Sequence, residues 1–325
     1  MKALKYSDIV LVPNYSECTT RSDCDVSVEI AGKKFRLPII PANMKSVINE
    51  QLAKWMSDND LFYIMHRFDI DIVEFVRRCN EQSWKNISIS VGVKEHDEKI
   101  IEAIAELKYR VDFITVDIAH GYSRSMCDML QFIREKLGDS VCVIAGNVAT
   151  RDAVVALNKW GADIVKLGIG QGSPCTTKDK TGFTVPMFTC VRKCHQCYAS
   201  QEEFDAGKRI PVIADGGVAC NGDIAKALVA GADLVMAGGL FASCIDSPAD
   251  VIMVDNMACK GYFGSASFQN KGHRNHIEGK LNKMESNGMS YEKKFEEITQ
   301  DLQSAVSYAG GGDLSSFNKV GHLEV

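Results

Sequence analysis

Eight short apolar runs, separated by stretches of helical length, recur along the chain and constrain its fold more than any other feature. The runs are rich in β-branched residues and continuously apolar, which is typical of strands buried on both faces of a parallel sheet. Eight such βα units in 325 residues fit a closed barrel better than an open doubly wound sheet. We therefore predict an α/β fold, a single (β/α)₈ (TIM) barrel that spans residues 1–325. The predicted strands are residues 37–40, 61–65, 87–93, 113–118, 141–145, 164–167, 212–214 and 234–237.

The segments between these runs have the length and the amphipathic pattern of helices. Beyond the last predicted strand the pattern changes, and we interpret residues 262–285, approximately, as a flap over the barrel mouth, although a solvated loop fits the same composition. A C-terminal helix is predicted at about 291–309. No insertion of domain size interrupts the βα units, so we expect no regulatory module. The other predicted helices are residues 49–58, 71–81, 98–108, 123–137, 151–160 and 223–230.

The charge balance of the chain bears on its partners. The formal net charge is −5 and the sequence pI is near 5.9. Because proteins that coat nucleic acid need clustered Lys and Arg side chains, this balance argues against nucleic acid. The N-terminal segment lacks the continuous apolar stretch of a signal peptide, and no apolar run reaches the roughly 18 residues of a membrane span. We expect a cytoplasmic protein that acts on a small molecule and has no membrane partner.

Twelve cysteines are scattered along the chain. Disulfide frameworks are typical of short secreted chains, so free and mostly buried thiols are expected here. Cys190, Cys194, His195 and Cys197 form the densest group, but no second pair follows at the spacing of a zinc site. Tyr198 stands where a haem-attachment motif requires His. We therefore predict neither zinc nor haem in this segment.

The strongest chemical signal is a glycine-rich loop at residues 168–178, directly after the sixth predicted strand. In this fold the catalytic groups lie on the loops at the carboxyl ends of the strands. The loop leads to Cys175, which is followed by hydroxyl side chains and Lys178. Glycines allow positive φ angles, and a neighbouring cation favours the thiolate, the nucleophilic form of cysteine. An isolated loop of this kind is often only structural, but its place after a barrel strand favours a nucleophilic Cys175.

Two glycine turns follow the seventh and eighth predicted strands, namely Asp215-Gly216-Gly217 and Gly238-Gly239. In TIM barrels the loops after these two strands commonly bind phosphate, and backbone amides can do so without Lys or Arg. The carboxylate of Asp215 suits the two hydroxyls of a sugar diol. Either turn alone can be structural, but the two together indicate a phosphorylated ligand.

Less specific polar groups follow two other predicted strands. Asp117, His120 and Tyr122 come after the fourth strand, and His66 and Arg67 come after the second. Because rim carboxylates are often solvated turn residues, these groups are weaker candidates for the same barrel mouth.

Taken together, these segments resemble the IMP dehydrogenase and GMP reductase family over essentially the whole chain. The most specific match is the cysteine loop, residues 168–182, followed by residues 213–217 and 222–227. The resemblance implies that Cys175 attacks C2 of a purine nucleotide, that the glycine turns hold its phosphate, and that a nicotinamide cofactor stacks beside the base. It also implies a homotetramer and a potassium ion held by the carbonyls of Gly170, Gly172 and Cys175.

Within this family the chain resembles the short bacterial reductases more than the dehydrogenases. Dehydrogenases usually carry a regulatory insertion and an Arg-Tyr pair in a long flap, whereas Tyr262 is not preceded by Arg. Residues 263–267, 277–280 and 301–308 match the reductases. The implied reaction is the irreversible, NADPH-dependent reductive deamination of GMP to IMP and ammonia, through a thioimidate on Cys175, in purine salvage.

The resemblance implies roles for further residues. Thr177 and Glu278 would transfer the proton that the departing nitrogen needs. The residues implied for GMP and IMP are Ser173, Asp215, Gly216, Gly217, Gly238, Gly239, Gly264, Ser265 and Gly279. Those implied for the NADPH cofactor, which a neighbouring subunit would help to bind, are Arg67, Asp117, His120, Gly121, Ser304, Ala305 and Ser307.

Three other functions share parts of this pattern. A minimal IMP dehydrogenase without its regulatory domain would use the same cysteine, and a flavin-binding barrel could use the same phosphate glycines. A catalytically inactive barrel could serve as a nucleotide sensor. The presence of Cys175, Thr177 and Glu278 together favours an enzyme over a sensor.

Overall fold

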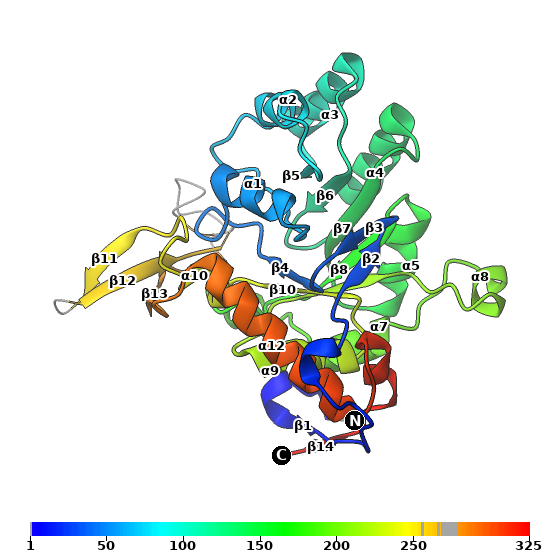
Figure 1. Ribbon diagram of the computed structural model, residues 1–325. Coiled ribbons are helices and arrows are strands. Elements are labelled where there is room, and N and C mark those ends of the chain that lie inside the picture. Colours follow the sequence, from blue (N-terminus) through cyan, green and yellow to red (C-terminus); the bar gives the residue numbers. More distant parts are fainter. Residues whose placement is uncertain (1, 255–256, 265–266, 268–277) are drawn as a thin grey trace.

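A curved sheet of seven parallel strands lies at the centre of the molecule (Figure 1). The computed structural model describes residues 2–254, 257–264, 267 and 278–325. The strand order is β4, β10, β9, β8, β7, β6 and β5, so β10 returns to pair with β4 as a barrel requires. This arrangement confirms the predicted α/β barrel fold class. The strands are β4 (Ile39–Pro41), β5 (Ser88–Val91), β6 (Phe113–Asp117), β7 (Cys142–Val148), β8 (Ile164–Leu167), β9 (Val212–Asp215) and β10 (Leu234–Ala237).

The second predicted strand, residues 61–65, is irregular. Among the described residues only Met65 forms a bridge there, parallel to Ile89 of β5. The side chains still alternate as in a strand, because Phe62 and Ile64 belong to the apolar cluster inside the barrel and their neighbours pack outward. The segment therefore occupies the strand position between β4 and β5 without a regular hydrogen-bond ladder.

Helices lie around the sheet (Figure 1), and several begin at a side chain that caps the first turn. Asn49, Asp71, Ser123 and Thr150 each accept a hydrogen bond from a backbone N–H of the helix that follows. The helix expected from residue 98 begins three residues earlier, because the Asp97 carboxylate accepts the backbone N–H of Lys94 and closes the first turn. The helices are α1 (Glu50–Asp58), α2 (Ile72–Glu81), α3 (Glu95–Leu107), α4 (Arg124–Leu137), α5 (Arg151–Lys159), α6 (Thr177–Thr181), α7 (Met187–Cys194), α8 (Gln201–Asp205), α9 (Asn221–Val229), α10 (Gly239–Ala242) and α12 (Tyr291–Ala309).

Aromatic side chains close the amino end of the barrel. Phe62 packs against Phe35 and Phe113, with ring centroids 4.9 Å and 4.7 Å apart. Phe35 belongs to a hairpin of β2 (Val28–Ile30) and β3 (Lys33–Phe35). Because these rings lie within the cluster that fills the barrel, the interior is a packed core and not a channel.

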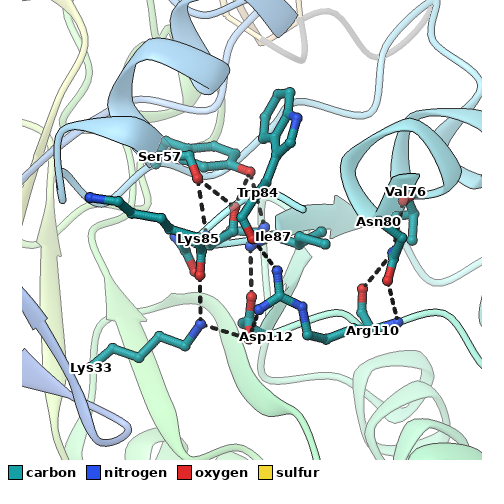
Figure 2. Close-up of polar contacts among 12 residues, drawn as sticks. Lys33, Ser57, Val76, Asn80, Trp84, Lys85, Ile87, Arg110 and Asp112 are labelled. Atoms are coloured by element: carbon teal, nitrogen blue, oxygen red, sulfur yellow. Dashed lines mark hydrogen bonds and ion pairs between the residues drawn. The ribbon is translucent and has the colours of Figure 1, made fainter. Parts of the chain in front are cut away.

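Three aspartates fasten neighbouring strands at the amino end of the sheet, and one such contact is drawn in Figure 2. Each aspartate comes one residue before a strand: Asp112 before β6, Asp163 before β8 and Asp233 before β10. Each carboxylate accepts a backbone N–H at or next to the start of the preceding strand. The donors are Ile87 at 2.7 Å, Val143 at 2.7 Å and Val212 at 2.8 Å, respectively. Each carboxylate also pairs with a cation. The cations are Lys33, Arg134 and Arg209, respectively.

We predict that Asp233→Ala destabilises the protein without changing its ligand binding. Asp233 accepts two hydrogen bonds from Arg209, at 2.6 and 2.7 Å, besides the backbone bond. Charged hydrogen bonds of this kind contribute about 1.5–3 kcal/mol each at most, so the free energy of unfolding should fall by roughly 2 kcal/mol. Urea unfolding measures the fall. Asp139→Ala is the matched control, because this carboxylate lies at the same end of the sheet but is fully exposed, and a change as large as that of Asp233→Ala would contradict the assignment.

A small antiparallel sheet projects from the other end of the barrel (Figure 1). It consists of β11 (Val251–Val254), β12 (Met257–Tyr262) and β13 (Asn282–Glu285). The flap expected at about 262–285 falls partly in this sheet, and residues 265–266 and 268–277 lie outside the described residues. The chain ends meet where β1 (Ile9–Leu11) pairs with β14 (His322–Glu324). In the described part of the chain, each helix is too short or too polar to cross a membrane.

Candidate active site

A cleft of about 170 Å³, open to solvent, lies at the carboxyl ends of the strands. Residues at or just beyond the ends of β4, β6, β7, β8, β9 and β10 line it, so the barrel brings together segments that are far apart in sequence. Tyr262, Gly264, Glu278 and Gly279 complete the wall. The cleft therefore lies where the fold places catalytic groups.

The loop after β8 carries Cys175 to this cleft. Gly168 starts the loop with a φ of +133°, and a Cβ atom there would lie 2.2 Å from the carbonyl oxygen of Asp215. Only glycine can approach β9 so closely at this angle. The chain then turns back at Gly170, and Cys175 is half-buried in the wall of the cleft.

Cys175, Thr177 and Glu278 form a continuous chain of polar contacts. The Cys175 Sγ donates to the Thr177 Oγ1 at 3.2 Å, and this hydroxyl donates to the Glu278 Oε2 at 2.6 Å. The flap residues are fixed to the cysteine loop by backbone bonds, because Thr176 N–H donates to the Glu278 carbonyl at 2.8 Å and Cys175 bridges Gly279. The three residues that the sequence singles out for nucleophile and proton transfer thus lie in contact.

A buried ion cluster forms the floor of the cleft, and sequence reasoning missed its central residue. The Lys166 ammonium, 3% exposed, lies 2.8 Å from the Asp117 carboxylate and 2.7 Å from the Asp215 carboxylate. Asn43 donates to Asp117 at 3.1 Å and Asn147 donates to Asp215 at 2.9 Å. A single cation in the middle of an apolar strand, Lys166 in β8, is the sequence signal that could have revealed the cluster.

Lys166 and Asp117 stabilise each other in their charged forms. Burial, the largest single effect, raises the pKa of Asp117, but the charge and hydrogen bond of Lys166, together with Arg67 and Asn43, outweigh it and hold that pKa below its ordinary value. Burial alone would lower the pKa of Lys166, but the two carboxylates outweigh it and raise that pKa. Because a buried charge is costly without a partner, the three side chains hold one another in place. Asp215 and Asp117 therefore present fixed acceptors to the cleft.

The two glycine turns differ in how their amides are used. The N–H of Gly216 donates to the Met236 carbonyl and the N–H of Gly217 donates to Gln171, both at 3.2 Å, so these amides already have partners. In the second turn, a Cβ atom at Gly238 would lie 1.9 Å from the hydroxyl oxygen of Tyr262.

Tyr262 is a second residue that sequence reasoning missed, because the sequence pattern predicts only that it belongs to the flap. Its side chain is 3% exposed and lines the cleft beside Gly238. The turn at Gly238 and the Tyr262 hydroxyl therefore lie together in the wall of the cleft.

The other expected nucleotide residues are only partly gathered. Gly264 and Gly279 line the cleft, whereas Ser173 is exposed and accepts a hydrogen bond from Asn282 at 2.7 Å. Gly239 follows Gly238 at the edge of the cleft and starts α10. Ser265 lies outside the described residues.

The expected cofactor residues fall into two groups. The first group lies at or near the cleft. Asp117 lines it, and the Arg67 side chain donates to the Asp117 carbonyl at 3.4 Å. The Gly121 N–H donates to the Asn147 carbonyl at 2.8 Å, and His120, just before it, is exposed. The remaining three lie on α12 and do not line the cleft within this chain. They are Ser304, Ala305 and Ser307.

His66, beside this rim, is a buried neutral imidazole. Its Nδ1 accepts the backbone N–H of Phe68 at 3.2 Å, and burial together with the charge of Lys45 lowers its pKa from 6.5 to about 4. In the unfolded chain the imidazole takes up its proton near pH 6.5. Stability is therefore complete above that pH and is lost as the pH falls toward 4.

We predict that the lowered pKa of His66 decreases the free energy of unfolding by about 2 kcal/mol when the pH falls from 7 to 5. His66→Asn should remove that part of the pH dependence, because the amide oxygen accepts the Phe68 N–H without titrating. Urea unfolding at the two pH values measures the difference. His120→Asn is the exposed control, and an unchanged slope in His66→Asn would contradict the prediction.

The cysteines outside the cleft are free thiols, as expected. Three of them belong to the core and are at most 1% exposed: Cys190 and Cys194 on α7, and Cys197 just after it. Among the described residues no group of three or more His, Cys, Asp or Glu side chains is arranged as a metal site.

Comparison with known proteins agrees with this geometry. The family model of the IMP dehydrogenase / GMP reductase domain matches residues 3–324. A GMP reductase of Mesoplasma florum is 43% identical over 325 residues, covering 99% of this chain and 98% of the relative. A GMP reductase of Staphylococcus aureus is 44% identical, covering 100% of this chain and 97% of the relative. A GMP reductase of Leptothrix cholodnii is 41% identical, covering 99% of this chain and 96% of the relative. The chain therefore belongs to the IMP dehydrogenase and GMP reductase family.

Proposed function

We propose that this protein converts GMP to IMP and ammonia, with NADPH as the hydride donor. The contact chain from Cys175 through Thr177 to Glu278 is the observation that carries the proposal. It joins a nucleophile to a proton-transfer pair, which is what removal of an amino group from a purine ring requires. The name GMP reductase of the full-length relatives supports the same substrate.

The reaction begins with attack of the Cys175 thiolate on C2 of the guanine ring. A C–S bond forms, and the ring electrons move onto the adjacent nitrogen. The amino group on C2 is a poor leaving group, so it must receive a proton before it departs as ammonia. The product of this half of the reaction is a thioimidate on Cys175.

Thr177 and Glu278 deliver that proton. The Thr177 hydroxyl is half-buried between the sulfur and the carboxyl group of Glu278. It can therefore pass a proton to the amino nitrogen and regain one from Glu278, which takes up its own proton from solvent. The backbone bond from Thr176 to the Glu278 carbonyl fixes the carboxylate at this place. Such positioned transfer typically contributes about 10²- to 10⁴-fold to the rate.

The rim near β6 and β7 fits a nicotinamide carboxamide. Asn147 lines the cleft there, and within the described structure its Oδ1 has no hydrogen-bond partner. An amide oxygen is an acceptor that suits the donor group of a carboxamide. When bound, the cofactor would supply the hydride for C2. The C–S bond to Cys175 would then break, returning the thiolate and releasing IMP. The reaction as a whole consumes GMP, NADPH and two protons and yields IMP, NADP⁺ and ammonium.

The remainder of the nucleotide is held by the floor of the cleft. Asp215, fixed by Lys166 and Asn147, accepts hydrogen bonds from the ribose diol. The turn at Gly238 and Gly239, with the Tyr262 hydroxyl, binds the phosphate. Asp117 pairs with the same lysine and faces the part of the cleft assigned to NADPH. Because Lys166 holds both carboxylates, it sets the distance between the GMP and NADPH sites.

We further propose that a potassium ion is held by the carbonyls of Gly170, Gly172 and Cys175. Carbonyl oxygens are ligands suited to potassium. The loop is sharply turned, with φ at Gly170 of +70°, and the Gly172 carbonyl already accepts the Cys175 N–H at 2.9 Å. Since a carbonyl oxygen has two lone pairs, it can still bind a cation, which would stiffen the loop that carries the nucleophile.

We also propose a homotetramer in which a neighbouring copy brings Ser304, Ala305 and Ser307 to the cofactor. The support is their place on α12, outside the cleft of their own chain. Sedimentation velocity measures the mass of the assembly, and a monomer with full activity would contradict this assignment.

The test of function is loss of NADPH absorbance. The purified protein is mixed with GMP and NADPH in potassium buffer, with IMP and NAD⁺ in a parallel reaction and lithium replacing potassium in a third. Oxidation of NADPH that requires GMP supports the proposal, and a slower rate in lithium supports the ion site. NADH formation from IMP would make the protein a dehydrogenase, and binding of GMP without turnover in either direction would make it a sensor.

A further inference from the structure

Two cysteines lie side by side in a loop far from the cleft. Cys18 and Cys24 flank the short helix η2 (Arg21–Asp23), and their sulfur atoms are 3.6 Å apart. A disulfide holds its sulfur atoms about 2.05 Å apart, so side-chain rotation and a small shift of the loop would bring them to bonding distance. In the reduced protein the two thiols are therefore in contact but not covalently bonded.

Solvent reaches one member of the pair more easily than the other. A surface groove is lined by both cysteines together with Glu17, Thr20 and Gly311. Cys18 is half-buried there, whereas Cys24 is 4% exposed. Burial, followed by the contact with Cys18, raises the pKa of Cys24 to about 11, so near neutral pH Cys24 is the less reactive thiol of the two.

We propose that Cys18 and Cys24 form a reversible intrachain disulfide by exchange with a low-molecular-weight disulfide. The Cys18 thiolate attacks one sulfur of the reagent, which releases one thiol and leaves a mixed disulfide. The Cys24 sulfur, giving up its proton, then attacks the Cys18 sulfur and releases the second thiol. Two cysteines are oxidised and one reagent disulfide is reduced to two thiols.

The disulfide would act on the segment that holds the C-terminal helix. The Gln303 side chain on α12 donates to the carbonyls of Ser22 and Cys24, at 3.1 and 3.2 Å. The Arg21 guanidinium lies 5.2 Å from the ring centroid of Tyr308, near the end of the same helix. A covalent link across this loop restricts the unfolded chain and should therefore raise the unfolding temperature.

Mass spectrometry tests the link directly. The folded full-length protein is equilibrated with mixtures of reduced and oxidised glutathione, quenched with acid, alkylated and cleaved with trypsin. Cleavage after Arg21 separates peptide 6–21, whose one cysteine is Cys18, from peptide 22–33, whose one cysteine is Cys24. We expect the two peptides to be recovered as a disulfide-linked pair, to separate after reduction, and to accompany a reversible rise in unfolding temperature.

Single variants separate exchange from simple modification. In Cys24→Ser, Cys18 should accumulate a stable glutathione adduct, and in Cys18→Ser, Cys24 should stay free. Cys127→Ser, which removes a half-buried cysteine elsewhere, should leave the linked pair unchanged. The proposal is overturned if Cys18 carries only glutathione in the wild-type protein at every ratio, or if the linked pair appears only after denaturation.

Discussion

Cys175→Ala should bind GMP and consume no measurable NADPH. Removing the thiol removes the only bond through which C2 is held while its amino group leaves, so no thioimidate forms. Loss of a covalent nucleophile typically lowers the rate by about 10⁴-fold or more, whereas alanine leaves the ribose and phosphate contacts of the cleft untouched. Initial rates of NADPH oxidation and GMP binding by calorimetry measure the two effects separately.

The matched control is Cys220→Ala, which removes an exposed cysteine that does not line the cleft. Its rate should equal that of the wild-type protein. If Cys175→Ala retained more than a tenth of the activity, the reaction would proceed without a covalent intermediate, and the assignment of the nucleophile would be wrong.

Thr177→Val should lower the turnover of GMP by roughly 10²- to 10⁴-fold while GMP binding changes little. Valine keeps the shape of threonine but cannot pass a proton between the amino nitrogen and Glu278, which lies 2.6 Å from the hydroxyl. Glu278→Gln should cause a similar loss, and the double variant should be hardly worse than either, because the two groups act as one unit. Steady-state rates give kcat and KM for each variant.

The leaving group offers a sharper test of the same pair. In 2-chloroinosine monophosphate, chloride replaces the amino group and leaves C2 without a proton, so Thr177→Val should process it nearly as well as the wild-type protein does. Thr176→Val, one residue earlier and outside the cleft lining, serves as the control. An equal loss with both substrates would show that Thr177 acts on thiolate attack or on structure and not on proton delivery.

The sequence predicts the barrel well where burial alone determines the strand. The run at residues 234–237 becomes β10 because a strand covered on both faces needs only apolar side chains. Residues 61–65 show the limit of this reasoning. Their side chains alternate between the barrel interior and its outside, but hydrogen bonding depends on the positions of β4 and β5, which no local pattern encodes.

The candidate site shows a similar division. Cys175 and Thr177 belong to the segment after β8 and Asp215 ends β9, so the fold itself places them at the barrel mouth. Lys166 lies inside β8, and its ammonium group pairs with the carboxylates of Asp117 in β6 and Asp215 in β9. These pairs form only when the three strands are in register, so the sequence alone does not reveal them. Tyr262 was equally hidden, because its role arises from its approach to Gly238 and not from its neighbours in sequence.

The proton-transfer pair is assembled late in the life of the chain. Glu278 follows Thr177 by 101 residues, so the ribosome must add that segment after it has made the hydroxyl. At roughly 5–20 residues per second, this takes about 5–20 s. The strands β9 and β10 are made in the same interval, so the barrel and the proposed relay are both incomplete until it ends. Under the proposed mechanism, turnover therefore begins only after the segment that contains Glu278 has been made and has folded back onto the cysteine loop.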